Sequence, residues 1–189
     1  LYVYGDLVWQ SGSIASCNSN NCHYQISGNM TFEANSNVSM NYGIFYFSAN
    51  GNSTIHLSDD ARIAVLYSYK ASPYTLTIEG SADKDLFLST GLQVDTGYRL
   101  NIVHQGGIYL EGNLVVNGLL TCSDGAFIFD GDANCNVTCS SSNGSYFNQL
   151  SIYLDSAYTV NLLTPIKVYA GLWINSGYLN SNSYSIQIY

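Results

Sequence analysis

The first nine residues alternate between two kinds of side chain. One set of alternate positions holds Leu1, Val3, Gly5, Leu7 and Trp9, and the other set is mostly polar. Because successive side chains of a strand point to opposite faces, this pattern predicts a strand with one apolar face. The small and polar residues at 10–16 have the composition of a flexible tether. Residues 1–9 are therefore predicted as an amphipathic strand, tethered to a body at 17–189.

A tethered amphipathic strand can pair in two ways. It folds back as the first strand of its own sheet, or it leaves and completes the sheet of a neighbouring molecule. The second way makes a head-to-tail contact that does not close on itself, and such contacts build filaments.

The rest of the chain repeats the same alternation in about a dozen short segments separated by turn residues, which is typical of a sandwich or barrel. The dipeptide Asn117-Gly118 is a hairpin signal. No segment keeps an apolar period of 3.6 residues over three turns, so the sequence predicts an all-β fold. We expect an antiparallel β-sandwich of the pilin or immunoglobulin-like, Greek-key type, completed by the N-terminal strand.

The runner-up architecture is a parallel β-solenoid, because residues 106–114 resemble one of its coils. A solenoid needs a period of about 20 to 30 residues held over several coils. The spacing in this chain drifts and no motif recurs in phase, which favours the sandwich. The serine-rich stretch at 140–145 either divides the body into two lobes or forms one long loop.

The composition narrows the classes of partner. Charged residues are 10% of the chain and the formal net charge is −8. Five basic residues do not neutralise a phosphate backbone, so nucleic acids and anionic membranes are not expected as partners. No window of eighteen residues is predominantly apolar, so no membrane span is expected. The chain begins with Leu1 rather than Met, and we interpret it as a secreted, mature product whose signal segment has been removed.

Five cysteines suggest disulfides in a secreted chain, with one thiol left over. Cys17 and Cys22 bracket a short polar loop and are expected to pair. Cys122 pairs with either Cys139 or Cys135; the sequence does not decide between them, and Cys139 is preferred.

Candidate chemistry is sparse. The three histidines join no nucleophile motif, and neither a Gly-x-Ser-x-Gly elbow nor a His-Glu-x-x-His helix is present. Asp130, Asp132 and Asn134 match the first three ligands of a calcium loop, but Cys135 replaces the required glycine and Ser141 the distal glutamate. A polar turn is the better interpretation, with calcium as the weaker alternative. We predict neither an enzyme nor a bound cofactor or metal.

Sequons for N-linked glycans occur at five asparagines. They are Asn29, Asn37, Asn52, Asn136 and Asn143. Asn52 and Asn143 lie in turn-like sequence, and we expect at least these two to carry glycans.

With a tethered donor-like strand, an all-β body and sequons, the chain resembles filament subunits joined by donor-strand exchange. It is most similar to the archaeal thread, an extracellular pilus of glycosylated β-sandwich subunits. Chaperone–usher pilins offer a second comparison, because they carry a glycine twelve residues before a near-terminal tyrosine. Gly177 and Tyr189 have this separation.

The resemblance implies a head-to-tail homopolymer on the cell surface that serves adhesion, cell–cell contact or biofilm formation. Residues 1–9 would fill a groove in the adjacent subunit, with Gly5 where the two backbones crowd. The apolar side chains expected in the pockets of that groove are Leu1, Val3, Leu7 and Trp9. The rival hypotheses are a monomeric carbohydrate-binding or adhesive domain, a solenoid-type polysaccharide lyase or hydrolase, and a coat-forming protein.

Overall fold

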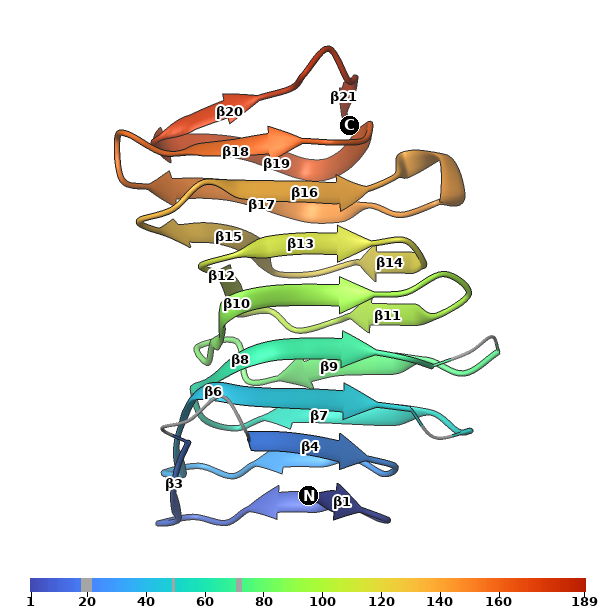
Figure 1. Ribbon diagram of the computed structural model, residues 1–189, viewed down its shortest axis with the longest axis vertical. Helices are drawn as coiled ribbons and strands as arrows, with labels where there is room; N and C mark the ends of the chain where they lie inside the picture. Colours follow the sequence, from blue (N-terminus) through green and yellow to red (C-terminus); the bar gives the residue numbers. More distant parts are fainter. Residues whose placement is uncertain (18–21, 49, 71–72) are drawn as a thin grey trace.

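The chain winds into a parallel β-solenoid of about eight turns in the computed structural model (Figure 1). The structure describes residues 1–17, 22–48, 50–70 and 73–189. Every strand pair among these residues is parallel. Paired positions lie between 19 and 26 residues apart, so each turn rests on the turn before it.

The strands are β1 (Tyr2–Val3), β2 (Leu7–Trp9), β3 (Ile14–Ser16), β4 (Cys22–Ile26), β5 (Met30–Phe32), β6 (Asn37–Phe47), β7 (Ser53–Leu57), β8 (Ala61–Ser68), β9 (Leu76–Gly80), β10 (Leu86–Val94), β11 (Arg99–Ile102), β12 (Gly107–Leu110), β13 (Asn113–Val116), β14 (Leu119–Cys122), β15 (Ala126–Gly131), β16 (Cys135–Cys139), β17 (Phe147–Leu154), β18 (Thr159–Leu162), β19 (Ile166–Ser176), β20 (Tyr178–Asn180) and β21 (Ile186–Ile188). One short 3₁₀ helix, η1 (Ser141–Asn143), lies between β16 and β17.

The strands stack into three faces, which we number in the order in which the chain first meets them. Face one holds β1, β4, the later parts of β6, β8 and β10, and then β13, β16, β18 and β20. Face two holds β2, β5, β7, β9, β11 and β14, followed by the starts of β17 and β19 and by β21. Face three holds β3, the starts of β6, β8 and β10, then β12 and β15, and the later parts of β17 and β19.

Long strands turn the corners between faces at irregular positions. β6 passes from face three to face one with a register shift between Met40 and Ile44, and β10 does so between Leu88 and Gly91. Bulges bend a strand without ending it. Faces one and three are thereby joined into a single 15-stranded sheet, which also includes β21 on face two. The strands β2, β5, β7, β9, β11 and β14 of face two form a separate sheet of six strands.

The core runs along the axis as rows of apolar side chains in register. On face two, Met30, Ile55, Ile78 and Ile102 stand above one another, and none is more than 1% exposed. On face three, the corresponding buried row is Val38, Ala61, Leu86, Ile108, Phe127 and Leu150. Each strand therefore has one apolar and one solvent-facing side, as its alternation predicted.

The predicted antiparallel β-sandwich is wrong, because every strand lies beside a parallel neighbour from the next turn of a solenoid. Alternation with a period of two records which side of a strand faces the core, but not which strand lies next to it. The drift in spacing that favoured the sandwich comes from corners of unequal length, since the inward rows stay in register. Asn117-Gly118 connects β13 on face one to β14 on face two and forms no hairpin.

The two predicted linkers lie within this stack. Within 10–16, the Ser13 hydroxyl donates to the Gln10 carbonyl in a turn, and the segment then continues as β3, which pairs with β6. The stretch at 140–145 is a corner that contains η1, and pairing of β13 with β16 and of β15 with β17 continues on both sides of it. One continuous stack extends over the described residues.

Candidate functional site

The first turn forms one end of the solenoid, which we call the N-terminal end and define by β1, β2 and β3. Among the described residues, these strands pair on one side only, with β4, β5 and β6. The Leu7 amide donates to Asn29 and the Trp9 carbonyl accepts from Glu33. Because neighbouring residues in a strand direct their backbone groups to opposite sides, Val8 directs its N–H and C=O toward the free edge.

The predicted donor strand lies against its own chain in this single molecule. Trp9 is 8% exposed and stacks on Phe32 with 4.8 Å between ring centroids. Val3 and Leu7 are half-buried against the core. The first residue, Leu1, is 69% exposed, and its ammonium group donates to the His23 carbonyl at 2.6 Å.

Gly5 does not occupy a crowded position in this arrangement. A Cβ built on Gly5 would meet no atom within 4 Å, whereas a Cβ on Gly28, in the next turn, would overlap the Gly5 backbone. The close approach of two backbones therefore depends on Gly28, which the sequence did not single out.

The last turn forms the opposite, C-terminal end, which we define by β20, β21 and the later part of β19. Leu172, Leu179 and Ile186 belong to inward rows but are only half-buried, because no described turn covers them. Exposed large apolar side chains gather around them: Tyr169, Trp173, Ile174, Tyr178, Tyr184, Ile188 and Tyr189. Gly177, with φ of +77°, forms the corner between β19 and β20, while Tyr189 stacks on Tyr169.

The two ends match each other face by face. On face one β1 is the outermost strand at the N-terminal end and β20 at the C-terminal end; on face two they are β2 and β21. On face three they are β3 and the later part of β19. Twelve of the sixteen large apolar side chains that are exposed among the described residues lie in the first turn or in the last. Sequence reasoning singled out the first end and missed the second, although its terminal strands alternate in the same way.

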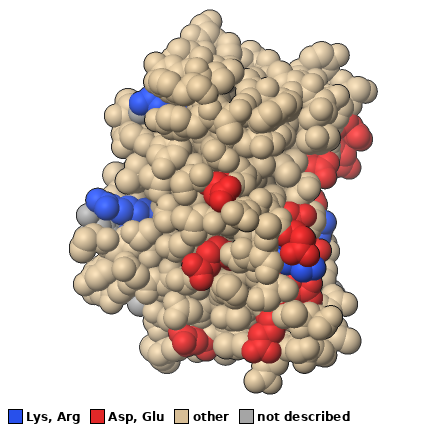
Figure 2. All heavy atoms as spheres, turned by 180° about the vertical axis from the view of Figure 1, so that it is seen from behind, with Lys and Arg blue, Asp and Glu red and all other residues tan. Residues whose placement is uncertain are grey.

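The exposed apolar side chains are concentrated at the two ends, whereas most charged side chains lie in the turns between them. All but one of the 13 acidic residues lie from Glu33 to Asp155, and Lys167 is the one charged side chain after Asp155. Figure 2 shows acidic side chains along one edge, over the middle of the face seen from behind and near its lower end. The first turn contributes one of them, Asp6, and no acidic side chain follows Asp155, so most of the acidic charge lies on the sides of the solenoid.

All five sequon asparagines are exposed. The side chains of Asn29 and Asn52 also accept hydrogen bonds through Oδ1 from the amides of Thr54 and Thr75 in the following turn. Asn143 instead uses Nδ2, the atom that carries a glycan, to donate to the Gly118 carbonyl. Asn37 and Asn136 lie on the outer sides of β6 and β16.

The predicted disulfide between Cys17 and Cys22 is present, with 6.3 Å between the Cα atoms. The other three cysteines are free and buried, so the predicted bond between Cys122 and Cys139 is not formed. Burial raises the pKa of the Cys122 and Cys135 thiols to about 11 and that of Cys139 to about 12. A thiol of this kind is neutral and unreactive at physiological pH.

The histidines and acids form no recognisable catalytic arrangement. His56 lies 3.2 Å from Glu79, and both side chains are nearly half exposed. His104 is buried, and its Nε2 donates to the Lys84 carbonyl at 2.6 Å. Within the described ranges, no three His, Cys, Asp or Glu residues come together to hold a metal. In the stretch interpreted as a polar turn, with calcium as the weaker alternative, Asn134 Oδ1 accepts a hydrogen bond from the Thr159 amide. The described part of the chain has no helix that could cross a membrane.

A cluster of tyrosines on face one could in principle bind sugars, but its members stack on one another's ring faces. Tyr46 and Tyr67 stack at 4.9 Å, and Tyr69 stacks on both at 6.0 and 5.8 Å. Burial raises the pKa of Tyr46 and Tyr69 above the ordinary value. A sugar binds an aromatic side chain through its open ring face, so this cluster is better suited to stabilising face one than to binding saccharides.

Comparisons of the chain with protein-family models, curated proteins and solved structures found no match. Geometry and sequence are therefore the basis for a functional proposal.

Proposed function

We propose that residues 1–189 form a structural β-solenoid that associates head to tail with copies of itself into an extracellular filament. The proposal rests on the observation that, within the described part of residues 1–189, both ends have apolar strand edges without a paired neighbour, and that these edges follow the same order of faces. This proposal keeps the head-to-tail homopolymer of the sequence analysis. It replaces insertion of a strand into a sandwich groove, which the observed fold does not provide, by stacking of one solenoid end on another.

Stacking would continue each face from one molecule into the next. The N-terminal end of one copy would lie on the C-terminal end of another, with β1 beside β20, β2 beside β21 and β3 beside β19. Free N–H and C=O groups at such edges are templates for pairing with another chain. Half-buried inward residues at both ends, such as Leu7 and Ile186, would then complete the core. Burying a large apolar side chain contributes about 1.5–3 kcal/mol before association costs are subtracted.

The distribution of charge supports association at the ends rather than at the sides. Acidic sides repel one another, and the repulsion weakens as salt screens it. The two ends, where Asp6 is the one acidic side chain, carry little of this penalty. Because the two ends are different surfaces, the contact is heterologous and continues as a filament unless its rotation closes a ring.

The extracellular location is supported by the Cys17–Cys22 disulfide, since disulfides persist in oxidising compartments. Adhesion, cell–cell contact or biofilm formation are the roles that we expect of such a filament.

The test blocks each end separately. Val8→Lys places a charge at the free edge of β2, where Val8 is 45% exposed, and Ile188→Lys does the same at β21, where Ile188 is 57% exposed. We expect unmodified residues 1–189 to form thin fibres in electron micrographs, and each variant alone to sediment as a monomer. Mixing the two variants should give a heterodimer, because one retains an intact N-terminal end and the other an intact C-terminal end.

A matched control is Tyr42→Lys, which charges an exposed apolar position, 48% accessible, on β6, outside the strands that define the two ends. This variant should polymerise normally and melt close to the parent, while the two monomeric end variants should melt close to each other and below the polymer. A monomeric parent at its highest soluble concentration would overturn the proposal. Dimers in both single variants and no heterodimer in the mixture would also overturn it, because they would indicate a symmetric contact between like ends.

A further inference from the structure

A groove lies at the corner between faces two and three, and its residues on β6 pair with β3 of the first turn. Its volume is about 450 Å³, which is within the usual range for small-ligand sites. The side chains that matter for the argument are Asn37, Ser39, Asp60, Arg62 and Phe87, contributed by three successive turns.

The groove exists because short and long side chains are neighbours in the same outward row. Ser39, Arg62 and Phe87 are in register on β6, β8 and β10. Ser39 is small, so the longer Arg62 stands above it as a wall. The Arg62 guanidinium lies over the Phe87 ring, 4.7 Å from its centroid, and also bonds to Glu111. These two contacts fix the position of that wall.

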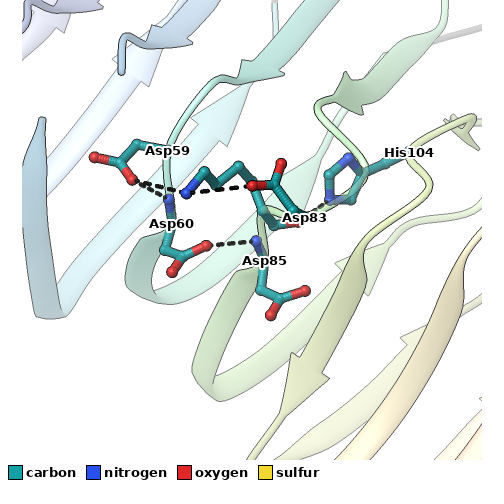
Figure 3. Close-up of polar contacts among 6 residues, drawn as sticks. Asp59, Asp60, Asp83, Asp85 and His104 are labelled. Carbon is teal, nitrogen blue, oxygen red and sulfur yellow. Dashed lines mark hydrogen bonds and ion pairs between the residues drawn. The ribbon is translucent and has the colours of Figure 1, made fainter. Parts of the chain in front are cut away.

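Two aspartates at the corner also line the groove, and hydrogen bonds and an ion pair hold this acidic wall in place (Figure 3). Asp60 Oδ1 accepts the Asp85 amide at 2.9 Å, and Asp59 Oδ1 accepts the Asp60 amide at 3.0 Å. Asp59 also lies 3.7 Å from the ammonium group of Lys84. Because each carboxylate has further lone pairs, both can still accept hydrogen bonds from a ligand.

A buried hydroxyl at the same corner has no partner among the described residues. Ser36 lines the groove, is 3% exposed, and its Oγ makes no hydrogen bond there. Buried polar atoms are nearly always bonded. Because this Oγ is closed to solvent, an ordered water inside the corner is the partner that it calls for, and the atom is not counted as a contact for a ligand in the groove.

We infer that the groove binds an uncharged saccharide. Carboxylates only accept hydrogen bonds, and a guanidinium only donates them. A ligand that spans Asp60 and Arg62 must therefore donate to one and accept from the other, and the hydroxyl groups of a sugar do both. An anionic ligand would be repelled by Asp59 and Asp60, while the Arg62 wall opposes a simple cation. The side-chain amide of Asn37 and the hydroxyl of Ser39 add further donors and acceptors.

The test measures retardation in native gels that contain laminarin, glucomannan or xylan, with polygalacturonate as an anionic comparison. The protein carries Ile188→Lys, which is remote from the groove and keeps end association out of the measurement. We expect at least one neutral polysaccharide to retard it, and Asp60→Asn to weaken the apparent affinity at least tenfold. Asparagine keeps the Oδ1 acceptor for the Asp85 amide, so this variant should fold.

A second variant fills the groove. Ser39→Tyr should abolish retardation, whereas Thr31→Tyr, which adds the same ring to the outer side of β5 on face two, should leave it unchanged. Retardation by none of the neutral polysaccharides would overturn the inference. So would stronger retardation by polygalacturonate, or calorimetric binding of calcium chloride alone that Asp60→Asn removes.

Discussion

The Oδ1 atom of Asn52 accepts a hydrogen bond from the backbone amide of Thr75, 3.0 Å away in the next turn of the solenoid. Thr75 is the residue directly before β9, so its amide lies outside that strand. The same arrangement recurs between Asn29 and Thr54 at 2.9 Å. Asparagine side chains thus satisfy backbone donors at corners where the sheet does not.

Replacing Asn52 with alanine should lower the free energy of unfolding by about 1 kcal/mol, because the amide of Thr75 loses its acceptor. Asn52→Asp retains an Oδ1 acceptor and should cost less. Urea denaturation followed by circular dichroism measures both. Asn41→Ala, at an exposed position of β6, is the matched control. Equal stabilities of Asn52→Ala and the control would show that the bond contributes nothing.

Glycan occupancy should differ between Asn52 and Asn143, which the sequence grouped together. Asn52 accepts the Thr75 amide through Oδ1, which leaves Nδ2 available for a glycan. We therefore expect Asn52 to be modified in a glycosylating host. Asn143 directs Nδ2 to the Gly118 carbonyl, and its modification would disturb that contact. Mass spectrometry of glycopeptides measures occupancy at each site. Full occupancy at Asn143 would contradict this use of its side chain.

The three free thiols should resist alkylation in the folded protein. Their pKa values are raised to between about 11 and about 12 by burial, so almost no thiolate is present at pH 8. Iodoacetamide should modify Cys122, Cys135 and Cys139 only in urea, with a rate that follows unfolding. Rapid labelling of any of them without denaturant would show that the site opens locally.

Alkaline pH should destabilise the protein through the same thiols. An unfolded thiol ionises near pH 9, while the buried thiols stay protonated until pH 11 or above. Between these values the native state binds more protons than the unfolded state, so the free energy of unfolding falls as pH rises. A variant with alanine at all three positions should show a shallower decrease between pH 8.5 and pH 10.5 in urea titrations. An unchanged slope would assign the decrease to the tyrosines, of which Tyr46, Tyr69 and Tyr109 also have raised pKa values.

Glycine should be required at Gly112 and dispensable at Gly5. A Cβ on Gly112 would overlap the Thr90 carbonyl in the preceding turn, whereas one on Gly5 would meet no atom within 4 Å. Gly112→Ala should lower the free energy of unfolding by about 2 kcal/mol or more, because overlap with backbone has no side chain to move aside. Gly5→Ala should have little effect. Thermal melts of the two variants make the comparison, and a destabilised Gly5→Ala would place a crowded neighbour at that position after all.

The sequence by itself determined the strands and their two sides. Alternating apolar positions correctly placed Val3, Leu7 and Trp9 on one apolar side of a strand, because that assignment depends on neighbours two residues away. They did not show that this side packs against the chain's own core, as it does here, rather than in the groove of an adjacent subunit. The Cys17–Cys22 disulfide was also predictable from local sequence, since the two cysteines bracket a short loop.

Only the tertiary structure decided which strand lies beside which, and with it the solenoid and both of its ends. Pairing depends on chain segments about 20 residues apart, and the period of two is the same for parallel and antiparallel neighbours. The signal was present as inward residues that recur from turn to turn, such as Leu86, Ile108 and Phe127. Corners of unequal length concealed it. The groove at Asp60 and Arg62 likewise exists only because stacking brings Ser39 beside a longer side chain from the next turn.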